Sequence, residues 1–243
     1  INFISFIGLF IGAAAIVLSV SVLNGFQGIL QTEAKKIYGD YLVKDISNTD
    51  FFNDLNMDNE NYSIFKENEF LIVSNKKHNL IEFKSVSNES LNDFYKLDLQ
   101  NNFKALSNKE VIIGNLLANR LNVDIGDSIQ LISKDFKLNS YSLPDIYEFK
   151  VANIFSNRIL RVNDFLVFGI NKEIFKKVNL SAEINGDIGN IKDSSTTFLS
   201  WKDRNRQLFE ATEIEKKITF FTLLLIVIIA SFNLSSSIMQ ISS

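Results

Sequence analysis

The sequence lacks several residue types on which whole classes of protein depend. It contains no cysteine, one histidine (His78) and one proline (Pro144) among its 243 residues. Without cysteine the chain has no disulfide framework, no thiolate metal site and no cysteine nucleophile. A single histidine excludes the usual histidine-rich zinc sites. The formal net charge of -3 argues against nucleic acid as a partner, because phosphate binding needs a basic surface.

Motifs of catalysis and of cofactor binding are missing as well. The sequence has no G-x-x-x-x-G-K-S/T phosphate loop, no G-x-S-x-G nucleophile motif and no H-E-x-x-H zinc motif. The acidic residues of 183–193 do not have the spacing of a calcium loop. His78 falls on a polar turn, which favours a solvated residue over a ligand. We therefore predict a chain that is not an enzyme, has no catalytic residue and binds no metal or cofactor.

Charge is missing from both ends of the chain. Every Asp, Glu, Lys and Arg lies between Glu33 and Lys217. The uncharged runs Phe3–Leu23 and Ile218–Ile241 are about 31 and 36 Å long as helices, enough to cross the core of a bilayer. The first run is too long for the apolar core of a secretory signal and has no basic start. We predict that both runs are transmembrane helices.

The first apolar run has a face of small residues. Gly8, Gly12, Ala15 and Ser19 follow helical spacing and share this face. Small residues let a second transmembrane helix approach closely, because lipid provides no hydrophobic drive for association. The partner helix belongs either to the same subunit or to another subunit, and the sequence leaves both open.

Both apolar runs continue as more polar helices. Apolar residues recur at helical spacing from Phe26 to Ile37, and Gly39 is a typical helix stop. Ser200 and Asp203 fit the start of the second helix. Two pairs at i, i+4 spacing support its solvated part, namely Arg206–Glu210 and Glu213–Lys217. Long helices of this kind either transmit motion between a membrane and an outside domain or serve only as a stalk.

Residues 40–199 have the pattern of a folded α+β domain. Strand-like segments flank the polar turn 74–79, which predicts a hairpin. Residues 110–121 predict a strand, a tight turn and a short helix, and 172–178 predict another helix. Hairpins mixed with β-α-β pieces indicate the α+β class. Three parts are predicted: a transmembrane helix with its extension over 1–39, the domain over 40–199, and a stalk helix with a truncated transmembrane helix over 200–243.

Three segments of the chain carry a family resemblance: IGLFIGAAAIVLSVSVLNGFQGIL (7–30), EVIIGNLLANRLNVDIGDSIQLIS (110–133) and WKDRNRQLFEATEIEKKITFFTLLLIVIIASFNLSSSI (201–238). They resemble the permease subunits of lipoprotein-releasing ABC transporters of the LolC/LolE type, a family related to MacB- and FtsX-type permeases. They are similar to the family's first span, to the core of its periplasmic domain and to the approach to its second span. The third segment is the most specific, because it combines an aromatic-basic start with an apolar run containing FN.

The resemblance implies an architecture and a set of partners. Such permeases have four spans, with a large periplasmic domain between the first two, and they pair as homodimers or heterodimers. A separate cytoplasmic ATPase dimer drives them. They take lipoproteins from the outer leaflet of the bacterial inner membrane and pass them to a periplasmic chaperone. The chain is then expected to be part of a multi-pass inner-membrane protein, with residues 40–199 in the periplasm.

The resemblance also implies two sites. In the family, the outer-leaflet ends of the first spans line a cavity for acyl chains. The matching positions are Val20, Val22, Leu23, Phe26, Phe220, Phe221 and Leu224. A protruding hairpin of one permease type catches the chaperone, and the matching loop is 134–146, with the apolar residues Phe136, Leu138, Tyr141, Leu143 and Pro144. The alternatives are plain lipid-facing side chains and a loop packed on its own domain.

Two other functions also fit the same pattern. A MacB- or FtsX-like permease for efflux or for regulation of cell-wall hydrolysis shares the architecture. A two-span membrane sensor with a periplasmic ligand-binding domain has the same arrangement of helices and domain. Residues beyond Ser243 discriminate between them, because a sensor continues into a cytoplasmic coiled coil and a permease into two further spans.

Overall fold

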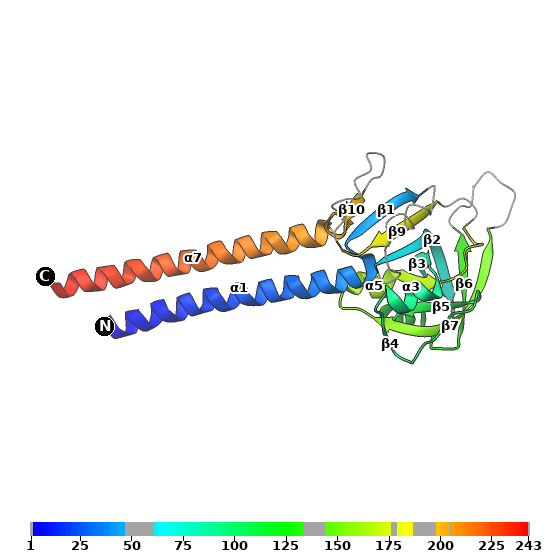
Figure 1. The fold of residues 1–243 in the computed structure, drawn as a ribbon. Coiled ribbons are helices and arrows are strands. Elements are labelled where there is room, and N and C mark those ends of the chain that lie inside the picture. The colour runs from blue at the N-terminus through cyan, green and yellow to red at the C-terminus, as the bar shows by residue number, and fades with distance from the viewer. Residues whose placement is uncertain are drawn as a thin grey trace. The chain divides into compact units, whose positions relative to one another are not determined.

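Two long helices and a domain rich in β-strands make up the chain (Figure 1). The computed structural model describes residues 2–46, 61–133, 144–175, 179–186, 198–204 and 206–242. Compact packing divides the chain into a helix pair, Ile1–Gln31 with Lys202–Ser243, and a domain, Thr32–Trp201. The last turns of the first helix therefore belong with the domain.

The two helices are α1 (Asn2–Tyr38) and α7 (Arg206–Ser242). Within α1, Phe10–Tyr38 is long and apolar enough to cross a membrane. The Arg206–Glu210 and Glu213–Lys217 ion pairs on α7 form as predicted, at 2.6 and 3.1 Å. Much of the predicted second span lies where the structure does not describe the side chains.

Helix α1 ends where the sequence places its stop. Gly39 has a φ of 60°, and its N–H donates to the Lys35 carbonyl at 2.9 Å. A residue that ends a helix in this left-handed backbone conformation is unstrained when it has no Cβ, which is why glycine is usual there. A Cβ at this position would also lie 2.9 Å from the Ile184 carbonyl oxygen. Gly39 therefore both ends α1 and lets the chain pass close to a neighbouring strand.

Six strands of the domain close into a barrel. In order around the barrel they are β2 (Tyr62–Ser74), β3 (Lys77–Ser85), β8 (Leu166–Gly169), β5 (Glu110–Gly114), β7 (Ile146–Ser156) and β6 (Ser128–Ser133), which pairs again with β2. The β3–β8 and β5–β7 pairs are parallel, and the other neighbours are antiparallel. The short strand β4 (Asp98–Leu99) adds to β7. Closure pairs the edges that an open sheet leaves unsatisfied.

Aromatic and branched side chains fill the barrel. Phe70 and Ile72 of β2 are buried, whereas the alternating residues Leu71 and Val73 are only half-buried. The ring of Phe83 lies 5.9 Å from that of Phe70, edge to face. Helix α4 (Asn115–Leu121) contributes Leu117, Ala118 and Leu121 to the same cluster. The core is therefore continuous from the barrel interior to one covering helix.

A second, smaller sheet extends from the start of β2. Its strands, in order, are β10 (Phe198–Ser200), β1 (Tyr41–Ile46), β9 (Leu180–Ile184) and the first part of β2, Tyr62–Phe65. We call it the base sheet, because β1 directly follows α1 and β10 directly precedes α6 (Trp201–Arg204). Its buried apolar cluster consists of Val43, Ala182 and Ile184. Strand β2 runs through both the base sheet and the barrel.

The predicted α+β class is confirmed, with one local correction. The β2–β3 hairpin and the β5–α4 unit form where the sequence predicts them. The hairpin turn has positive φ at Asn75 and Lys76, as tight two-residue hairpins require. The helix predicted for 172–178 is wrong in its described part, because 172–175 form a turn, which follows α5 (Leu160–Phe165) and β8 in the sequence. Asn171 explains the turn, since its side-chain oxygen accepts from the Glu173 N–H at 3.0 Å.

Candidate functional site

Helices α1 and α7 run side by side and antiparallel within the helix pair (Figure 1). The Lys216 ammonium donates to the Asn24 side-chain oxygen at 2.5 Å. About three turns further along, a Cβ added to Gly12 would lie 3.6 Å from Val227 Cγ2. A polar contact and an apolar contact therefore fix the register of the two helices.

The four small residues of α1 differ in their exposure to solvent. Gly12, Ala15 and Ser19 are half-buried, on the side of α1 that approaches Val227. Gly8 is exposed, and no atom would lie within 4 Å of a Cβ there. Within this chain the close approach is thus at Gly12. Packing of all four residues against another helix stays a prediction.

The seven residues predicted to contact acyl chains fall into two groups. Val20 and Leu23 are half-buried. The other five are exposed, from Leu224 at 38% to Val22 at 70%, and they include Phe26, Phe220 and Phe221. The rings of Phe220 and Phe221 contact each other edge to face, 5.9 Å apart. The helix pair thus presents these five side chains outward instead of enclosing them, and acyl-chain binding stays a prediction.

The predicted chaperone loop lies mostly outside the described residues, which include Pro144 but not Phe136, Leu138, Tyr141 or Leu143. The described strands on either side of it are β6 and β7 of the barrel. The Ser133 N–H donates to the Asp145 carbonyl at 3.1 Å and continues their ladder. The two ends of the loop are therefore held together at the end of a hairpin.

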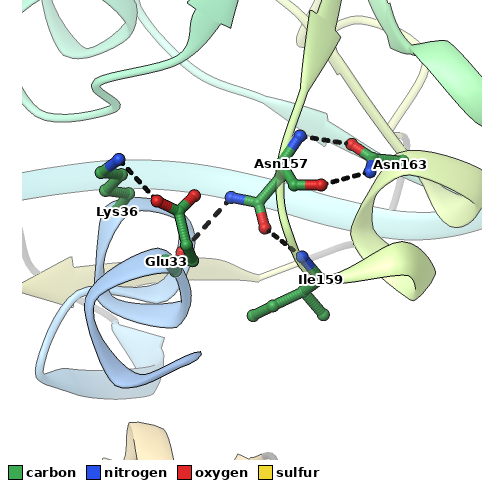
Figure 2. Close-up of polar contacts among 5 residues, drawn as sticks. All are labelled: Glu33, Lys36, Asn157, Ile159 and Asn163. Atoms are coloured by element: carbon green, nitrogen blue, oxygen red, sulfur yellow. Dashed lines mark hydrogen bonds and ion pairs between the residues drawn. The ribbon is translucent and has the colours of Figure 1, made fainter. Parts of the chain in front are cut away.

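Asn157 joins the last turns of α1 to the connection between β7 and α5 (Figure 2). Its side-chain amide donates to the Glu33 carbonyl at 3.4 Å, and its side-chain oxygen accepts from the Ile159 N–H at 2.8 Å. Asn163 exchanges two hydrogen bonds with the backbone of Asn157, at 2.7 and 2.5 Å. Lys36 pairs with Glu33 at 2.8 Å on the same turn. The domain therefore binds the α1 backbone through a side chain that is itself held rigidly.

Asp40 connects the strand after α1 with the segment that leads into α6. Its carboxylate pairs with Lys35 at 2.5 Å and accepts from the Gly186 N–H at 2.9 Å. Its backbone N–H donates to the Ile184 carbonyl at 2.8 Å, and its carbonyl accepts from the Trp201 N–H at 3.0 Å. The chain therefore enters and leaves the base sheet at the same residue.

A buried ion pair lies between the barrel and the base sheet. Lys84 Nζ of β3 is 2.6 Å from Glu183 Oε1 of β9, and both side chains are 0% exposed. The hydroxyl of Tyr95, which follows α3 (Asn88–Asp93), donates to Glu183 Oε2 at 2.6 Å. The ring of Phe65 lies 4.1 Å and that of Tyr38 5.7 Å from the ammonium. Aromatic faces and a hydrogen bond thus replace the water around the two charges.

Sequence reasoning missed both the ion pair and Asn157. In β3, Lys84 alternates with the core residue Phe83, so the pattern predicts a solvent-facing side chain. Its burial depends on β9, α3 and the end of α1, which come from distant parts of the sequence. Asn157 is one of many asparagines in polar segments and carries no distinguishing signal. Within the described part of the chain, no group of three His, Asp or Glu side chains is placed to hold a metal ion.

Comparison with known proteins supports the resemblance found in the three segments. No protein-family model matches the chain. LolC, the transmembrane protein of a lipoprotein-releasing system, from Buchnera aphidicola subsp. Schizaphis graminum is 25% identical over 260 residues, covering 97% of this chain and 65% of that protein. LolC of Neisseria meningitidis serogroup B is 22% identical over 270 residues, covering 99% and 65%.

A more distant likeness is found among solved structures. The extracellular domain of the ABC-type transporter YknZ from Gram-positive bacteria aligns with a TM-score of 0.41 at 12% identity, covering 63% of this chain and 86% of that chain. The chain spans about 65% of the length of the curated relatives it matches. The resemblance to LolC-type permease subunits is confirmed, and it extends over nearly the whole chain.

Proposed function

We propose that the chain is part of a permease subunit of an ABC transporter that extracts lipoproteins from the outer leaflet of the bacterial inner membrane and passes them to a periplasmic chaperone. The observation that carries the proposal is the similarity to LolC proteins over 97% and 99% of the chain. An α+β domain between two long helices, with uncharged ends, supports the same conclusion. The domain would lie in the periplasm.

The outward apolar surface of the helix pair would hold the acyl chains of the cargo. The exposed residues Val22, Phe26 and Phe221 supply large apolar side chains with no charge on the same segments. Burial of acyl chains against them gains about 25 cal/mol for each Å2 removed from water. Val20, Leu23, Phe220 and Leu224 would complete this surface.

Energy would come from ATP hydrolysed by a separate cytoplasmic ATPase dimer, with a second permease subunit beside this one. Helix α1 would carry the movement, because it continues without a break from the uncharged segment to the Glu33–Asn157 contact. The contribution of this chain would be mechanical: it binds cargo through apolar contacts and moves its domain as the helices move.

The end of the β6–β7 hairpin would dock the chaperone. On the outside of the barrel, Leu80, Leu71, Ile132 and Ile146 lie in register across four adjacent strands beside the loop. Leu80 is 43% and Ile146 57% exposed. An exposed aliphatic row of this kind is typical of an interaction surface. Together with Phe136, Leu138, Tyr141, Leu143 and Pro144 it would supply the apolar contacts.

Reconstitution of the full-length permease with its ATPase and partner permease in proteoliposomes tests the function. Liposomes that contain an acylated lipoprotein should release it to a soluble periplasmic chaperone only when ATP is present. The same lipoprotein without acyl chains is the control for cargo specificity. ATP hydrolysis without release would instead favour efflux or mechanical signalling, and failure to bind any ATPase would favour a sensor.

A pair of matched variants tests the acyl surface in the same assay. Phe221→Ala removes a ring proposed to contact acyl chains, and we expect release to fall roughly tenfold, since burial of one such side chain contributes about 1.5–3 kcal/mol. Phe10→Ala removes a ring that is equally exposed, at 68% against 65%, but lies outside the proposed surface. Equal losses for the two variants would contradict the assignment.

A further inference from the structure

The buried ion pair Lys84–Glu183 has no part in the function proposed above, although its place in the domain is distinctive. Lys84 belongs to the barrel and Glu183 to the base sheet, so the pair connects two regions that share strand β2. Along β2, pairing changes from β9 to β3 between Phe65 and Lys66. A single strand passing between two regions permits bending at that point. The ion pair provides a second connection away from β2.

Because the ion pair is buried, it favours one relative position of the barrel and the base sheet. Both charges are 0% exposed, and removal of charges from water is so unfavourable that a well-packed apolar pair is often at least as stabilising. The hydrophobic stabilisation of an apolar pair is non-directional, so burial alone does not select one geometry. Lys84 and Glu183 instead have one favourable arrangement, since any slip lengthens the 2.6 Å contact between two buried opposite charges.

The surroundings connect this pair to the end of α1. The Tyr38 ring at the end of α1 lies 5.7 Å from Lys84 Nζ. Next to Glu183, the Ile184 carbonyl accepts from the N–H of Asp40, the residue at which the chain enters the base sheet. Tyr95 holds the second carboxylate oxygen at 2.6 Å. The ion pair therefore lies between the end of α1 and the barrel.

We propose that Lys84, Glu183 and Tyr95 are positioning residues that hold the base sheet in one orientation on the barrel, so that movement of α1 displaces the barrel instead of bending β2. The transport role of this lock rests on the proposed function, whereas the lock itself does not. Its removal leaves a folded protein in which ATP is hydrolysed but cargo release is poorly coupled to it.

The triple variant Lys84→Met, Glu183→Leu, Tyr95→Phe removes both charges and the hydroxyl while preserving bulk. In the reconstituted transporter we expect ATPase activity to persist and the lipoprotein released per ATP to fall about tenfold, within the range of measured coupling effects. Arg120→Gln is the matched control, because it breaks the Arg120–Asp164 ion pair of the same domain, whose side chains are 55% and 27% exposed. Unchanged release per ATP in the folded triple variant would overturn the transport role.

Hydrogen exchange of the full-length permease in nanodiscs tests the lock without any cargo. We expect amides of β9 and β1 to exchange about tenfold faster in the triple variant, with those of β5 and β7 unchanged. Equal acceleration everywhere, or none, would overturn the lock. Tyr95→Phe alone loses one hydrogen bond and should shift β9 in the same direction if the triple variant does not fold. If the wild-type protein is folded by hydrogen exchange but releases no lipoprotein, the proposed function is wrong. The comparison of hydrogen exchange between the wild type and the triple variant still tests the lock.

Discussion

The barrel and the base sheet have the same kind of backbone pairing but are held in place by different forces. The barrel encloses a large cluster of aromatic and branched residues, including Phe70, Phe83 and Phe149. Among the described residues, the base sheet's own cluster is small and consists of Val43, Ala182 and Ile184, with Leu42 and Phe65 buried outside that cluster. It is also held by polar links, namely the contacts of Asp40 and the Lys84–Glu183 pair.

The difference follows from what each region connects. Burial of apolar side chains is the dominant favourable contribution to folding, and the hydrophobic effect behind it is non-directional. Hydrogen bonds and buried charges add less net stability but fix distances and angles. The base sheet, which is joined to α1 and α6, therefore carries the directional contacts. The barrel, which is farther from these helices in the sequence, contains the large core.

The largest expected effect is the loss of a ring from the barrel. Phe83→Ala should lower the free energy of unfolding by about 3–5 kcal/mol, as is usual for a phenylalanine deleted from a packed core. Val43→Ala in the base sheet should lower it by roughly 1–2 kcal/mol, since it removes far less apolar surface. Hydrogen exchange of barrel amides in the full-length protein measures both. Similar losses for the two variants would contradict the difference in packing.

A companion substitution checks the same core. A Cβ at Gly169 would lie 2.4 Å from Phe83 Cζ, so Gly169→Ala should be strongly destabilising in the wild type. In the Phe83→Ala background the clash disappears, and the same substitution should be nearly neutral. A non-additive cycle of this kind identifies direct contact.

The next largest effect concerns the helix pair, whose contact is neither a packed core nor a polar network. Gly12→Leu should force α1 and α7 apart at a cost of about 1–3 kcal/mol, as overpacking does, whereas Gly12→Ala should be tolerated. Because the chain has no cysteine, Asn24→Cys with Lys216→Cys reports the separation by the rate of disulfide formation. Gly8→Leu is the control, since no atom lies within 4 Å of a Cβ there. Equal slowing by both leucines would contradict the register.

A smaller and more local effect is expected at the Asn157 contact. Asn157→Ala removes the bonds to Glu33 and Ile159 and should destabilise the end of α1 by about 1–2 kcal/mol. Exchange of the amides of 34–37 should report it. Asn171→Ala is a matched control, because Asn171 also bridges a carbonyl and an N–H but on an exposed turn. If both variants loosen α1 equally, the contact has no specific role.

The smallest effect is a pH dependence at the start of α3, the helix that precedes Tyr95. A backbone N–H and then the Ser87 hydroxyl hold the pKa of Glu89 below its ordinary value. The resulting stability is present above the ordinary pKa of glutamate and is lost as the pH falls through the lowered one. Glu89→Gln should flatten this dependence in thermal unfolding between neutral and acidic pH. An unchanged slope would show that Glu89 does not contribute.

Local patterns in the sequence predicted the parts of the fold that depend on neighbouring residues. The hairpin at Asn75–Lys76, the β5–α4 unit and the end of α1 at Gly39 each follow from a short run. Barrel closure does not, because it depends on the pairing of β6 with β2, a strand from a distant part of the sequence. The burial of Lys84 is hidden for the same reason, since the residues that cover it are far away in the sequence.

The meeting of Asp40 with Trp201 has a consequence for the topology of the whole chain. A backbone hydrogen bond of 3.0 Å joins Asp40, which precedes the first strand of the domain, to Trp201, which follows strand β10. In terms of topology, the residues between Asp40 and Trp201 are an insertion into the antiparallel pair formed by α1 and α7. An insertion whose ends nearly touch can be exchanged for another of different size without altering the hairpin. The backbone hydrogen bond between Asp40 and Trp201 marks the position at which such an exchange would be made.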